Sequence, residues 1–408
     1  MTARSKTRSL LLAACAIFLP ASGYTGEQDV HPHNAVERME NILDAALADG
    51  VPGISVAIAT TEGILWTKTA GYADLSAKTP VRSDHLFGIG SITKTFVAVV
   101  ILQLVEEGRI SLDQTPASIV GDAVKDVANA DRATLAHLLN HTSGIPSWED
   151  DPTWIREGRG AALDVNRRWG KRDTLPYIAD TPALFEPGAQ YSYSNSNHTV
   201  LGLVIEAVTG NAAVEEIRQR VLQPIGVDSI YLEGFEPLPS DCLAARYHHA
   251  TETFKQDAGV ADAFTELRPG LIDVSASNLS VEWTAGGMVA EAGALARYAV
   301  ALSQGQLLSE ESMAVVSDWF PVKDGVEVGH GVFRYENAAG FILGHGGDVL
   351  GYTANMHWIE NTDIAVVVLT NVGTMHTGGG QPNAYAIGRN SPFMQAAADY
   401  VSSAAGGD

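Results

Sequence analysis

The chain has 408 residues, of which 46% are hydrophobic and 18% are charged, so it holds ample apolar material for a folded core. Its 26 basic residues are outnumbered by 48 acidic residues, which gives a formal net charge of −22. That balance argues against the basic patches that proteins need to bind nucleic acids or anionic lipid headgroups. Neither a nucleic acid nor a membrane surface is therefore an expected partner.

The first 23 residues have the pattern of a signal peptide. A basic stretch, "MTARSKTR", precedes the apolar run "SLLLAACAIFLP", and the small residues "ASG" offer a cleavage site before Tyr24. The apolar run is too short to span a bilayer. We therefore predict a signal peptide at 1–23 and an exported protein, periplasmic or secreted. The alternative, a lipoprotein cleavage box ending at Cys15, is less favoured because the apolar run continues past that cysteine.

The two ends of the remaining chain carry the clearest secondary-structure patterns. The spacing of apolar residues predicts a helix over 34–50, and alternation around Glu62-Gly63 predicts a hairpin over 53–74. Near the other end, four strands are predicted over 328–336, 340–347, 353–360 and 363–371, followed by a helix over 390–406. Between them, helical patterns alternate with loops rich in Gly, Pro and Asn. These patterns predict an α/β (α+β) fold over 24–408, in which both ends build one antiparallel sheet flanked by helices and a mostly helical region at roughly 100–285 is inserted.

A serine and a lysine stand three residues apart in the stretch "GIGSITKTFVA". In a helix that begins at Ser91, Ser91 and Lys94 share one face. A serine hydroxyl is a weak nucleophile until a neighbouring group takes its proton, and a buried lysine with a lowered pKa can do so. An N-cap serine followed by a solvated lysine is the bland alternative. A lysine in the first turn of a helix opposes the helix dipole, however, and its apolar neighbours predict that this helix is buried.

Two further motifs follow in order: Tyr193-Ser194-Asn195 in "PGAQYSYSNSNHTVLG" and His345-Gly346-Gly347 in "GHGGDVLGY". The ordered set S-x-x-K, Y-x-N and H-x-G resembles the serine β-lactamase and penicillin-binding-protein superfamily. The Y-x-N form is similar to the class C β-lactamase and D-Ala-D-Ala carboxypeptidase branch. The likeness extends over roughly Asn34 to Asp399, and it implies a β-lactamase/transpeptidase-like fold.

The resemblance implies a role for each matching residue. Ser91 would be the acylated nucleophile, and Lys94 would be either its proton acceptor or its electrostatic partner. Tyr193 would carry a proton to the leaving group, and in the family the alternative is that it shares the role of base with the lysine. Asn195 would hold the amide side chain of the substrate and help to position Lys94. His345 would hydrogen-bond the tyrosine or the substrate. No cofactor and no metal ion is implied, and the other histidines lack the spacing of a metal site.

The residues after His345 bear on the substrate. Gly346, Gly347 and Asp348 would line the substrate site, and the oxyanion would lie between the backbone N–H groups of Ser91 and Asp348. The Asp348 side chain would disfavour a substrate with a free C-terminal carboxylate unless it points away or a cation such as Arg334 compensates for it.

Three hypotheses on function remain. The favoured one is an exported serine hydrolase that forms an acyl-enzyme on Ser91 with D-Ala-D-Ala-type peptides or β-lactams, so that a small molecule or a peptide is the expected partner. The second is a carboxylesterase or D-amino-acid amidase with the same catalytic residues. The third is a non-catalytic binding module of the same fold, which would have no need to keep all five residues of the motif set.

Overall fold

The computed structural model describes residues 32–405. The predicted signal peptide at 1–23 and Cys15 lie outside the described residues. Within the described range, no helix combines the length and the apolar character that crossing a membrane requires.

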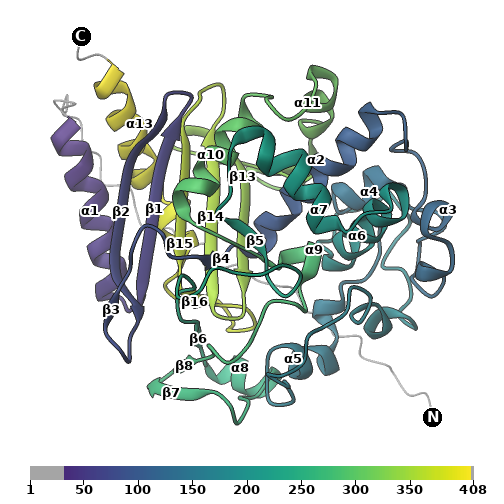
Figure 1. The fold of residues 1–408 in the computed structure, drawn as a ribbon, viewed down its shortest axis with the longest axis horizontal. Helices are drawn as coiled ribbons and strands as arrows, with labels where there is room; N and C mark the ends of the chain where they lie inside the picture. The colour runs from purple at the N-terminus through teal and green to yellow at the C-terminus, as the bar shows by residue number, and fades with distance from the viewer. Residues whose placement is uncertain (1–31, 406–408) are drawn as a thin grey trace, which may run out of the picture.

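Most strands of the main sheet lie near the two ends of the described chain, and helices dominate its middle (Figure 1). The α-helices are α1 (Pro32–Ala48), α2 (Thr93–Glu106), α3 (Pro116–Val120), α4 (Leu135–Leu139), α5 (Pro152–Gly158), α6 (Asn195–Thr209), α7 (Ala213–Ile217), α8 (Glu252–Asp257), α9 (Trp283–Gly286), α10 (Ala292–Ser303), α11 (Glu310–Val316), α12 (Ala384–Gly388) and α13 (Ser391–Ala405). The strands are β1 (Gly53–Thr60), β2 (Gly63–Asp74), β3 (Thr79–Pro80), β4 (Phe87–Gly88), β5 (Ile230–Leu232), β6 (Tyr247–His249), β7 (Thr265–Arg268), β8 (Leu271–Asp273), β9 (Met288–Ala290), β10 (Phe320–Lys323), β11 (Val326–Val328), β12 (Phe333–Asn337), β13 (Gly340–Val349), β14 (Tyr352–Ile359), β15 (Ala365–Thr370) and β16 (Val372–Gly373).

The main sheet is built from both ends of the chain, as the sequence predicts. Its nine strands run in the order β10-β11-β12-β13-β14-β15-β1-β2-β3, and each neighbouring pair is antiparallel. The N-terminal hairpin joins the C-terminal strands where Ile54 pairs with Thr370 and Val56 pairs with Val368. This confirms the predicted mixed α/β fold with an antiparallel sheet. The predicted domain boundaries stay predictions.

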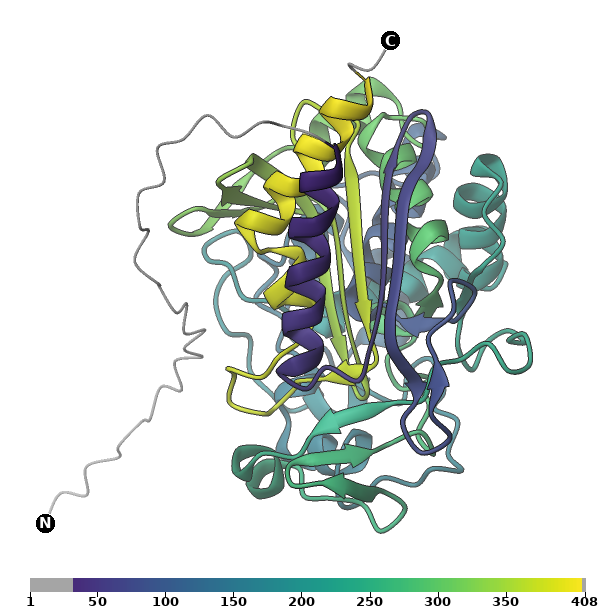
Figure 2. The same cartoon turned by 90° about the vertical axis from the view of Figure 1, so that its left-hand side faces the viewer.

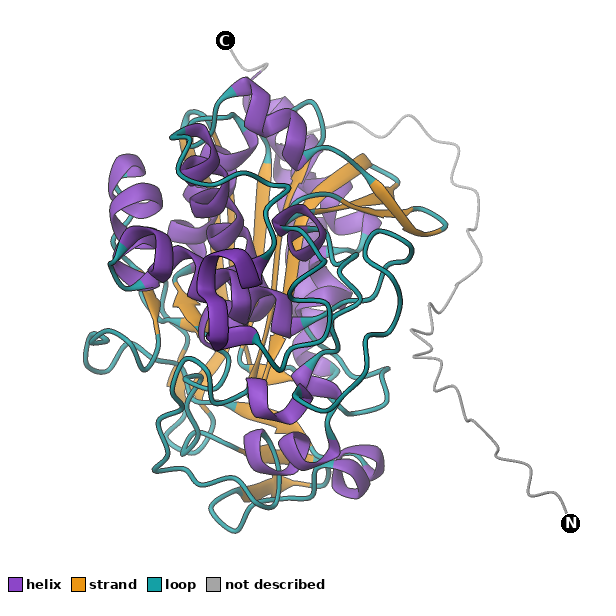
Figure 3. Cartoon of the chain, turned by 90° about the vertical axis from the view of Figure 1, so that its right-hand side faces the viewer, coloured by secondary structure: helices purple, strands orange, loops and turns teal. Residues whose placement is uncertain are grey.

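Helices cover both faces of this sheet, so the central strands are apolar on both sides. All eight residues of β1 are buried. Because side chains alternate along a strand, Val56 packs toward α1 and α13, while Ala57 packs toward α10 and the larger helical layer. Figure 2 shows α1 and α13 side by side against one face, although they come from opposite ends of the chain. The short helix α12 packs on the same face as α1 and α13, and the larger helical layer, with α2, α6 and α10, faces the viewer in Figure 3.

Two small sheets connect the main sheet to the helical layer. One has the strand order β16-β6-β8-β7, and the other has the order β4-β9-β5. The second sheet matters most for the site, because β4 leads directly into the turn that carries Ser91.

The structure corrects two details of the predicted elements. The pattern over 328–336 is not one strand: β11 ends at Val328, β12 begins at Phe333, and Gly331 between them has a positive φ of 96°. The helix predicted to begin at Ser91 begins at Thr93, since Ser91 lies in the preceding 3₁₀ turn η1 (Gly90–Ile92).

Candidate active site

Ser91 is placed by backbone contacts on both sides of its turn. The Ile89 N–H donates to the carbonyl of Met288 in β9 at 2.9 Å, which ties the turn to the small sheet. Gly90 has a positive φ of 50°, and a Cβ there would lie 2.7 Å from the amide nitrogen of Asp348. The turn therefore needs glycine at position 90, and it brings Ser91 close to the predicted oxyanion donor on β13.

Lys94 is fully buried and lies beside Ser91. Its Nζ is 2.9 Å from the Ser91 Oγ and 2.7 Å from the Asn195 Oδ1, and it also donates to the carbonyl oxygen of Ala285. Burial lowers the pKa of Lys94 to about 7, against the opposing attraction of Glu149 and Glu282. Close to neutral pH, a large fraction of this lysine is therefore uncharged and able to accept a proton.

The three partners of Lys94 determine where an uncharged amine directs its free electron pair. A backbone carbonyl oxygen and an amide Oδ1 only accept hydrogen bonds, so the two remaining N–H groups of Lys94 go to Ala285 and Asn195. Ser91 is the one partner of the three with a hydrogen to donate. The electron pair of Lys94 therefore faces the Ser91 hydroxyl.

Tyr193 lies over the same pair of residues. Lys94 Nζ is 5.0 Å from the centre of its ring, and the His141 ring stacks on it with centroids 4.3 Å apart. Burial raises the pKa of Tyr193 well above its ordinary value, and the neighbouring Ser91 hydroxyl offsets part of that rise. The Tyr193 hydroxyl is buried and has no hydrogen-bond partner of good geometry among residues 32–405. It stays a phenol, with a proton to give.

His141 follows the end of α4, in the segment "HLLNHTSGI". Its Nδ1 accepts a hydrogen bond from the Ser194 N–H at 3.1 Å, next to Tyr193. Burial lowers its pKa well below the ordinary value, so the ring is uncharged. His141 thus supports the Tyr193 ring as an uncharged packing residue.

Asn195 begins α6 and joins Lys94 to a second group of charges. Its Oδ1 accepts from Lys94, and its Nδ2 donates to the carboxylate of Glu149. Glu149 is paired with Arg159 at 3.1 Å, and Arg159 is paired with Glu282 at 3.0 Å. Asn195 therefore contacts Lys94, as the motif set implies, and it does so within a buried chain of hydrogen bonds and ion pairs.

His345 projects from β13 toward the helical layer. It is buried, its ring centre lies 6.2 Å from that of Tyr193, and burial lowers its pKa to about 3. Because Nδ1 lies 2.5 Å from the carbonyl oxygen of Gly346, which only accepts, Nδ1 carries the hydrogen. Nε2 therefore carries the free electron pair, and His345 is an uncharged acceptor at neutral pH.

The two glycines after His345 allow close backbone contacts. A Cβ on Gly347 would lie 1.8 Å from the carbonyl oxygen of Ile89, and one on Gly346 would lie 2.4 Å from the Tyr385 ring and 2.8 Å from a terminal guanidinium nitrogen of Arg389. Gly347 thus lets β13 reach the turn of Ser91, and Gly346 lets the side chains around α12 pack on the opposite face.

The side chains of Asp348 and Arg334 both have partners within the protein, so neither is directed at a substrate carboxylate. Asp348 lies on the face of β13 opposite His345, where it accepts hydrogen bonds from the Thr374 N–H at 3.0 Å and from the Thr374 hydroxyl. Burial raises the pKa of Asp348 to about 7. Arg334 makes ion pairs with Glu327 and Glu360, each at 2.9 Å.

The segment that supplies the Ala285 carbonyl has an unusual backbone. Trp283 has a φ of +38°, a conformation that bulky residues rarely adopt and that costs on the order of 1–3 kcal/mol. The following glycines leave no room for side chains, since a Cβ on Gly287 would lie 2.8 Å from the carbonyl oxygen of Trp283. This strained turn directs the Ala285 carbonyl at Lys94.

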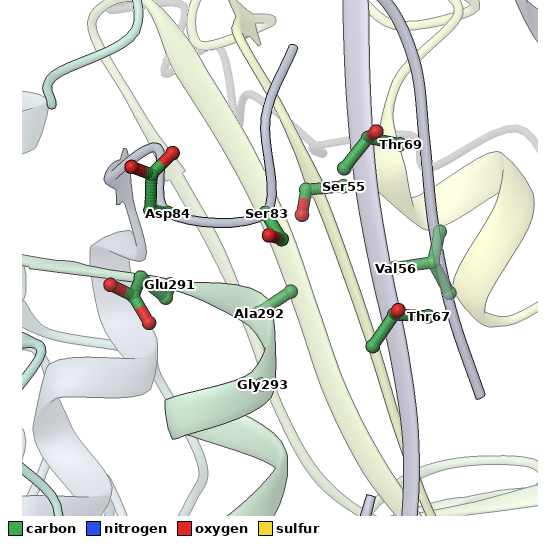
Figure 4. Close-up of a pocket in the computed structure, with 9 residues that line it drawn as sticks. All are labelled: Ser55, Val56, Thr67, Thr69, Ser83, Asp84, Glu291, Ala292 and Gly293. Atoms are coloured by element: carbon green, nitrogen blue, oxygen red, sulfur yellow. The ribbon is translucent and has the colours of Figure 1, made fainter. Parts of the chain in front are cut away.

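A separate cavity of about 160 Å³ lies between β1, β2, the segment before β4 and the first turn of α10 (Figure 4). Hydroxyl groups and two carboxylates line it, from Ser55, Thr67, Thr69, Ser83, Asp84 and Glu291. None of the predicted site residues is among its lining residues. Within the described chain, no group of three or more His, Cys, Asp or Glu side chains is placed to hold a metal ion.

The predicted residues come together, but their roles stay predictions. Ser91, Lys94, Tyr193, Asn195 and His345 converge from η1, α2, the start of α6 and β13. Sequence reasoning missed the Glu149–Arg159–Glu282 group, whose members lie far apart in the chain and match no motif. The one local signal is the sequence "WED" at 148–150, since a glutamate directly after a large aromatic residue is a candidate for a partnered charge.

Comparison with known proteins places the chain in a family. The Beta-lactamase family model matches residues 37–387, so the chain belongs to the beta-lactamase family. It is 31% identical to esterase EstB of Burkholderia gladioli over 52% of this chain and 54% of that protein. It is 30% identical to penicillin-binding protein 4 of Amycolatopsis lactamdurans over 48% of this chain and 47% of that protein. The chain thus spans about half the length of these curated relatives.

The fold of a solved structure agrees over a longer stretch. A D-stereospecific amidohydrolase from a Streptomyces species superimposes with a TM-score of 0.72 at 27% identity, and the match covers 86% of this chain and 97% of that one. The predicted likeness to the serine β-lactamase and penicillin-binding-protein superfamily is therefore confirmed. The matched relatives are hydrolases and penicillin-binding proteins of this fold.

Proposed function

We propose that this protein is a serine hydrolase that forms an acyl-enzyme on Ser91. The observation that carries the proposal is the 2.9 Å contact between Lys94 and Ser91, in which the serine is the one partner of Lys94 that can donate a hydrogen. Convergence of nucleophile and base within hydrogen-bond reach is the signature of an activated nucleophile.

The reaction follows from these contacts. Lys94 accepts the hydroxyl proton as Ser91 Oγ attacks the substrate carbonyl carbon, and the backbone N–H groups of Ser91 and Asp348 receive the negative charge on its oxygen. Tyr193 gives its proton to the leaving group as the bond to the carbonyl carbon breaks, and the proton held by Lys94 replaces it. Water then attacks the acyl-enzyme and releases the acid and free Ser91.

The substrates we favour are carboxylic esters and amides of D-amino acids without a free carboxylate near the scissile bond. His345 and Tyr193 carry no charge at neutral pH, and Arg334 is already paired with two glutamates. A substrate carboxylate next to His345 would therefore leave water without gaining a charged partner from these residues. The likeness to an esterase and to a D-stereospecific amidohydrolase supports the same choice.

D-Ala-D-Ala-type peptides and β-lactams are the second candidate class. The observation that favours them is the position of the Asp348 carboxylate, which lies on the face of β13 opposite His345. Because the Asp348 carboxylate accepts a hydrogen bond from Thr374, it faces away from the carboxylate of such a substrate and does not repel it. The likeness to a penicillin-binding protein agrees with this class.

Intact-protein mass and turnover separate these outcomes. The purified protein and its Ser91→Ala variant are incubated with benzylpenicillin, p-nitrophenyl acetate and the p-nitroanilides of D- and L-alanine. We expect the wild-type protein to hydrolyse p-nitrophenyl acetate and to hydrolyse the p-nitroanilide of D-alanine faster than that of L-alanine. Ser91→Ala should hydrolyse neither. A stable penicilloyl adduct on Ser91 without turnover of the other probes would favour the second class. No turnover and no adduct with any probe would overturn the hydrolase proposal.

We also propose that the protein is exported, on the basis of the basic and apolar pattern in residues 1–23. Expression in a bacterial host followed by N-terminal sequencing of the periplasmic and secreted fractions tests this. A mature chain that begins at Tyr24 supports export by signal peptidase. A lipid-modified chain that begins at Cys15 would support the alternative.

A further inference from the structure

Three charged side chains are buried behind the Ser91–Lys94 pair, and the reaction proposed above does not use them. Arg159 is 1% exposed, and Glu149 and Glu282 are 10% and 4% exposed. They come from three separate elements: the turn over 148–150, the end of α5 and the residue before α9. We call them the Glu149–Arg159–Glu282 assembly. Burying charges costs free energy, so such an ion-pair group is weak evidence for a role in stability alone.

Its contact with the site runs through Asn195. The Glu149 carboxylate accepts one hydrogen bond from Asn195 Nδ2 and one from Arg159, and a carboxylate offers only acceptors. The Asn195 amide must therefore present Nδ2 to Glu149, and this leaves Oδ1 to face Lys94. If the amide were turned over, Nδ2 would face Lys94 and could donate to its electron pair, drawing that pair away from Ser91.

We propose that the Glu149–Arg159–Glu282 assembly is a positioning device: it locks the orientation of the Asn195 amide, so that the electron pair of uncharged Lys94 is directed at the Ser91 hydroxyl. This inference rests on the proposed function of Ser91 and Lys94 and adds three positioning residues to it. Arg159 holds the Glu149 carboxylate in place, and Glu282, whose pKa burial raises to about 7, balances the charge of Arg159 in its ionised form.

The assembly also acts on the charge of Lys94. The negative charges of Glu149 and Glu282 each raise the pKa of Lys94, and the positive charge of Arg159 lowers it. Loss of either glutamate charge therefore favours the uncharged amine and moves the titration of Lys94 to lower pH. Only the loss of Glu149 also frees the Asn195 amide to turn over. The two glutamates are thus separable by experiment.

Two variants and a matched control test this. Glu149→Gln places an amide NH₂ against either Asn195 Nδ2 or Arg159, because glutamine has one acceptor where two are needed. Glu282→Gln removes charge without touching Asn195. Glu233→Gln breaks another buried ion pair, that of Glu233 with Arg246 at 2.6 Å, away from Lys94. Two quantities are measured in full-length protein: the pH dependence of Ser91 labelling by a fluorophosphonate, and the titration of Lys94 by NMR of ¹³Cε-lysine, assigned with Lys94→Met.

We expect both glutamine variants in the assembly to move the Lys94 titration to lower pH, whereas Glu233→Gln leaves it in place. At high pH, Glu149→Gln should label Ser91 about 10- to 100-fold more slowly, the loss typical of a misdirected catalytic group. Glu282→Gln should lose less. Labelling of Glu149→Gln at the wild-type rate, or a Lys94 titration that neither variant moves, would overturn the inference. Failure of the wild-type protein to take label at Ser91 would overturn the hydrolase proposal instead, and the NMR titration would still decide whether the assembly acts on Lys94.

Discussion

The burial of Lys94 leads to the clearest prediction of how activity depends on pH. Burial lowers its pKa to about 7, and only the uncharged amine can accept the Ser91 proton. We therefore expect kcat/KM for p-nitrophenyl acetate to rise about tenfold per pH unit below pH 7 and to level off above it. Lys94→Arg should lower kcat/KM by about 10²- to 10⁴-fold, since a guanidinium stays charged at every working pH.

Lys68→Arg is the matched control for that substitution. Lys68 pairs with Glu40 at 2.6 Å on the outside of the sheet, and we expect its arginine variant to keep the wild-type pH profile. A Lys94→Arg variant with undiminished activity, or a wild-type profile that is flat between pH 5 and 8, would contradict the role of Lys94 as base.

At this scale the sequence could predict the residues that stand in short motifs, and not those that meet through the fold. Ser91 and Lys94 are three residues apart, so helical geometry alone brings them together. Glu149 and Asn195 are 46 residues apart, and Arg159 and Glu282 are 123 residues apart. No local pattern encodes such contacts, because they depend on how α5, α6 and α9 pack.

Among the elements, the contact between β13 and the η1 turn decides whether the nucleophile and the oxyanion donor meet. It depends on Gly347, where a Cβ would lie 1.8 Å from a backbone oxygen of Ile89. Gly347→Ala must move β13 away from Ser91, and we expect it to lower kcat/KM about 100-fold, the loss typical of a displacement near 1 Å. Fluorophosphonate labelling and thermal unfolding of the purified variant measure the effect on the site and on the fold.

Gly293→Ala provides the matched glycine control for this prediction. Gly293 lies in the first turn of α10, and nothing lies within 4 Å of an added Cβ. Alanine should stabilise that helix by up to about 1 kcal/mol and leave the labelling rate unchanged. Wild-type labelling in Gly347→Ala would show that β13 can carry a side chain there and that this close approach is unnecessary.

The elements also show where sequence patterns mislead. The sequence pattern predicts β1, β2, β13, β14 and β15 for two reasons. Helices cover both faces of the sheet, which gives its central strands continuous apolar runs, and recognisable turn residues mark where the strands end. The pattern over 328–336 fails at the Gly-His-Gly stretch 329–331, where Gly331 has a positive φ and the backbone passes between α2 and the carbonyl of Leu139. The edge strand β10 and its neighbour β11 have only four and three residues, too few to establish a period, so their pairing becomes evident only in the folded sheet.

For the whole molecule, the two ends of the chain form one structural layer. The α1 and α13 helices pack together on the face of the sheet opposite α10, and the pair of Arg38 with Asp399 at 2.6 Å joins them. The antiparallel sheet that supports β13 therefore combines strands from near both ends of the described chain. The sequence indicates this arrangement, because strand patterns lie near both ends and helical patterns between them.

This layer should contribute stability and leave the chemistry untouched. Phe393 of α13 is fully buried against the sheet, so Phe393→Ala should lower the free energy of unfolding by about 3–5 kcal/mol, as core truncations of aromatic residues do. Exposed Gln395 on the same helix is the control, and Gln395→Ala should change the free energy of unfolding by less than about 0.5 kcal/mol. Urea unfolding gives both values. Because Phe393 packs on the far face, folded Phe393→Ala should keep the pH dependence set by Lys94. A shift of that dependence would mean that the α1–α13 layer is coupled to the site through the sheet, which the separation of the two apolar clusters does not predict.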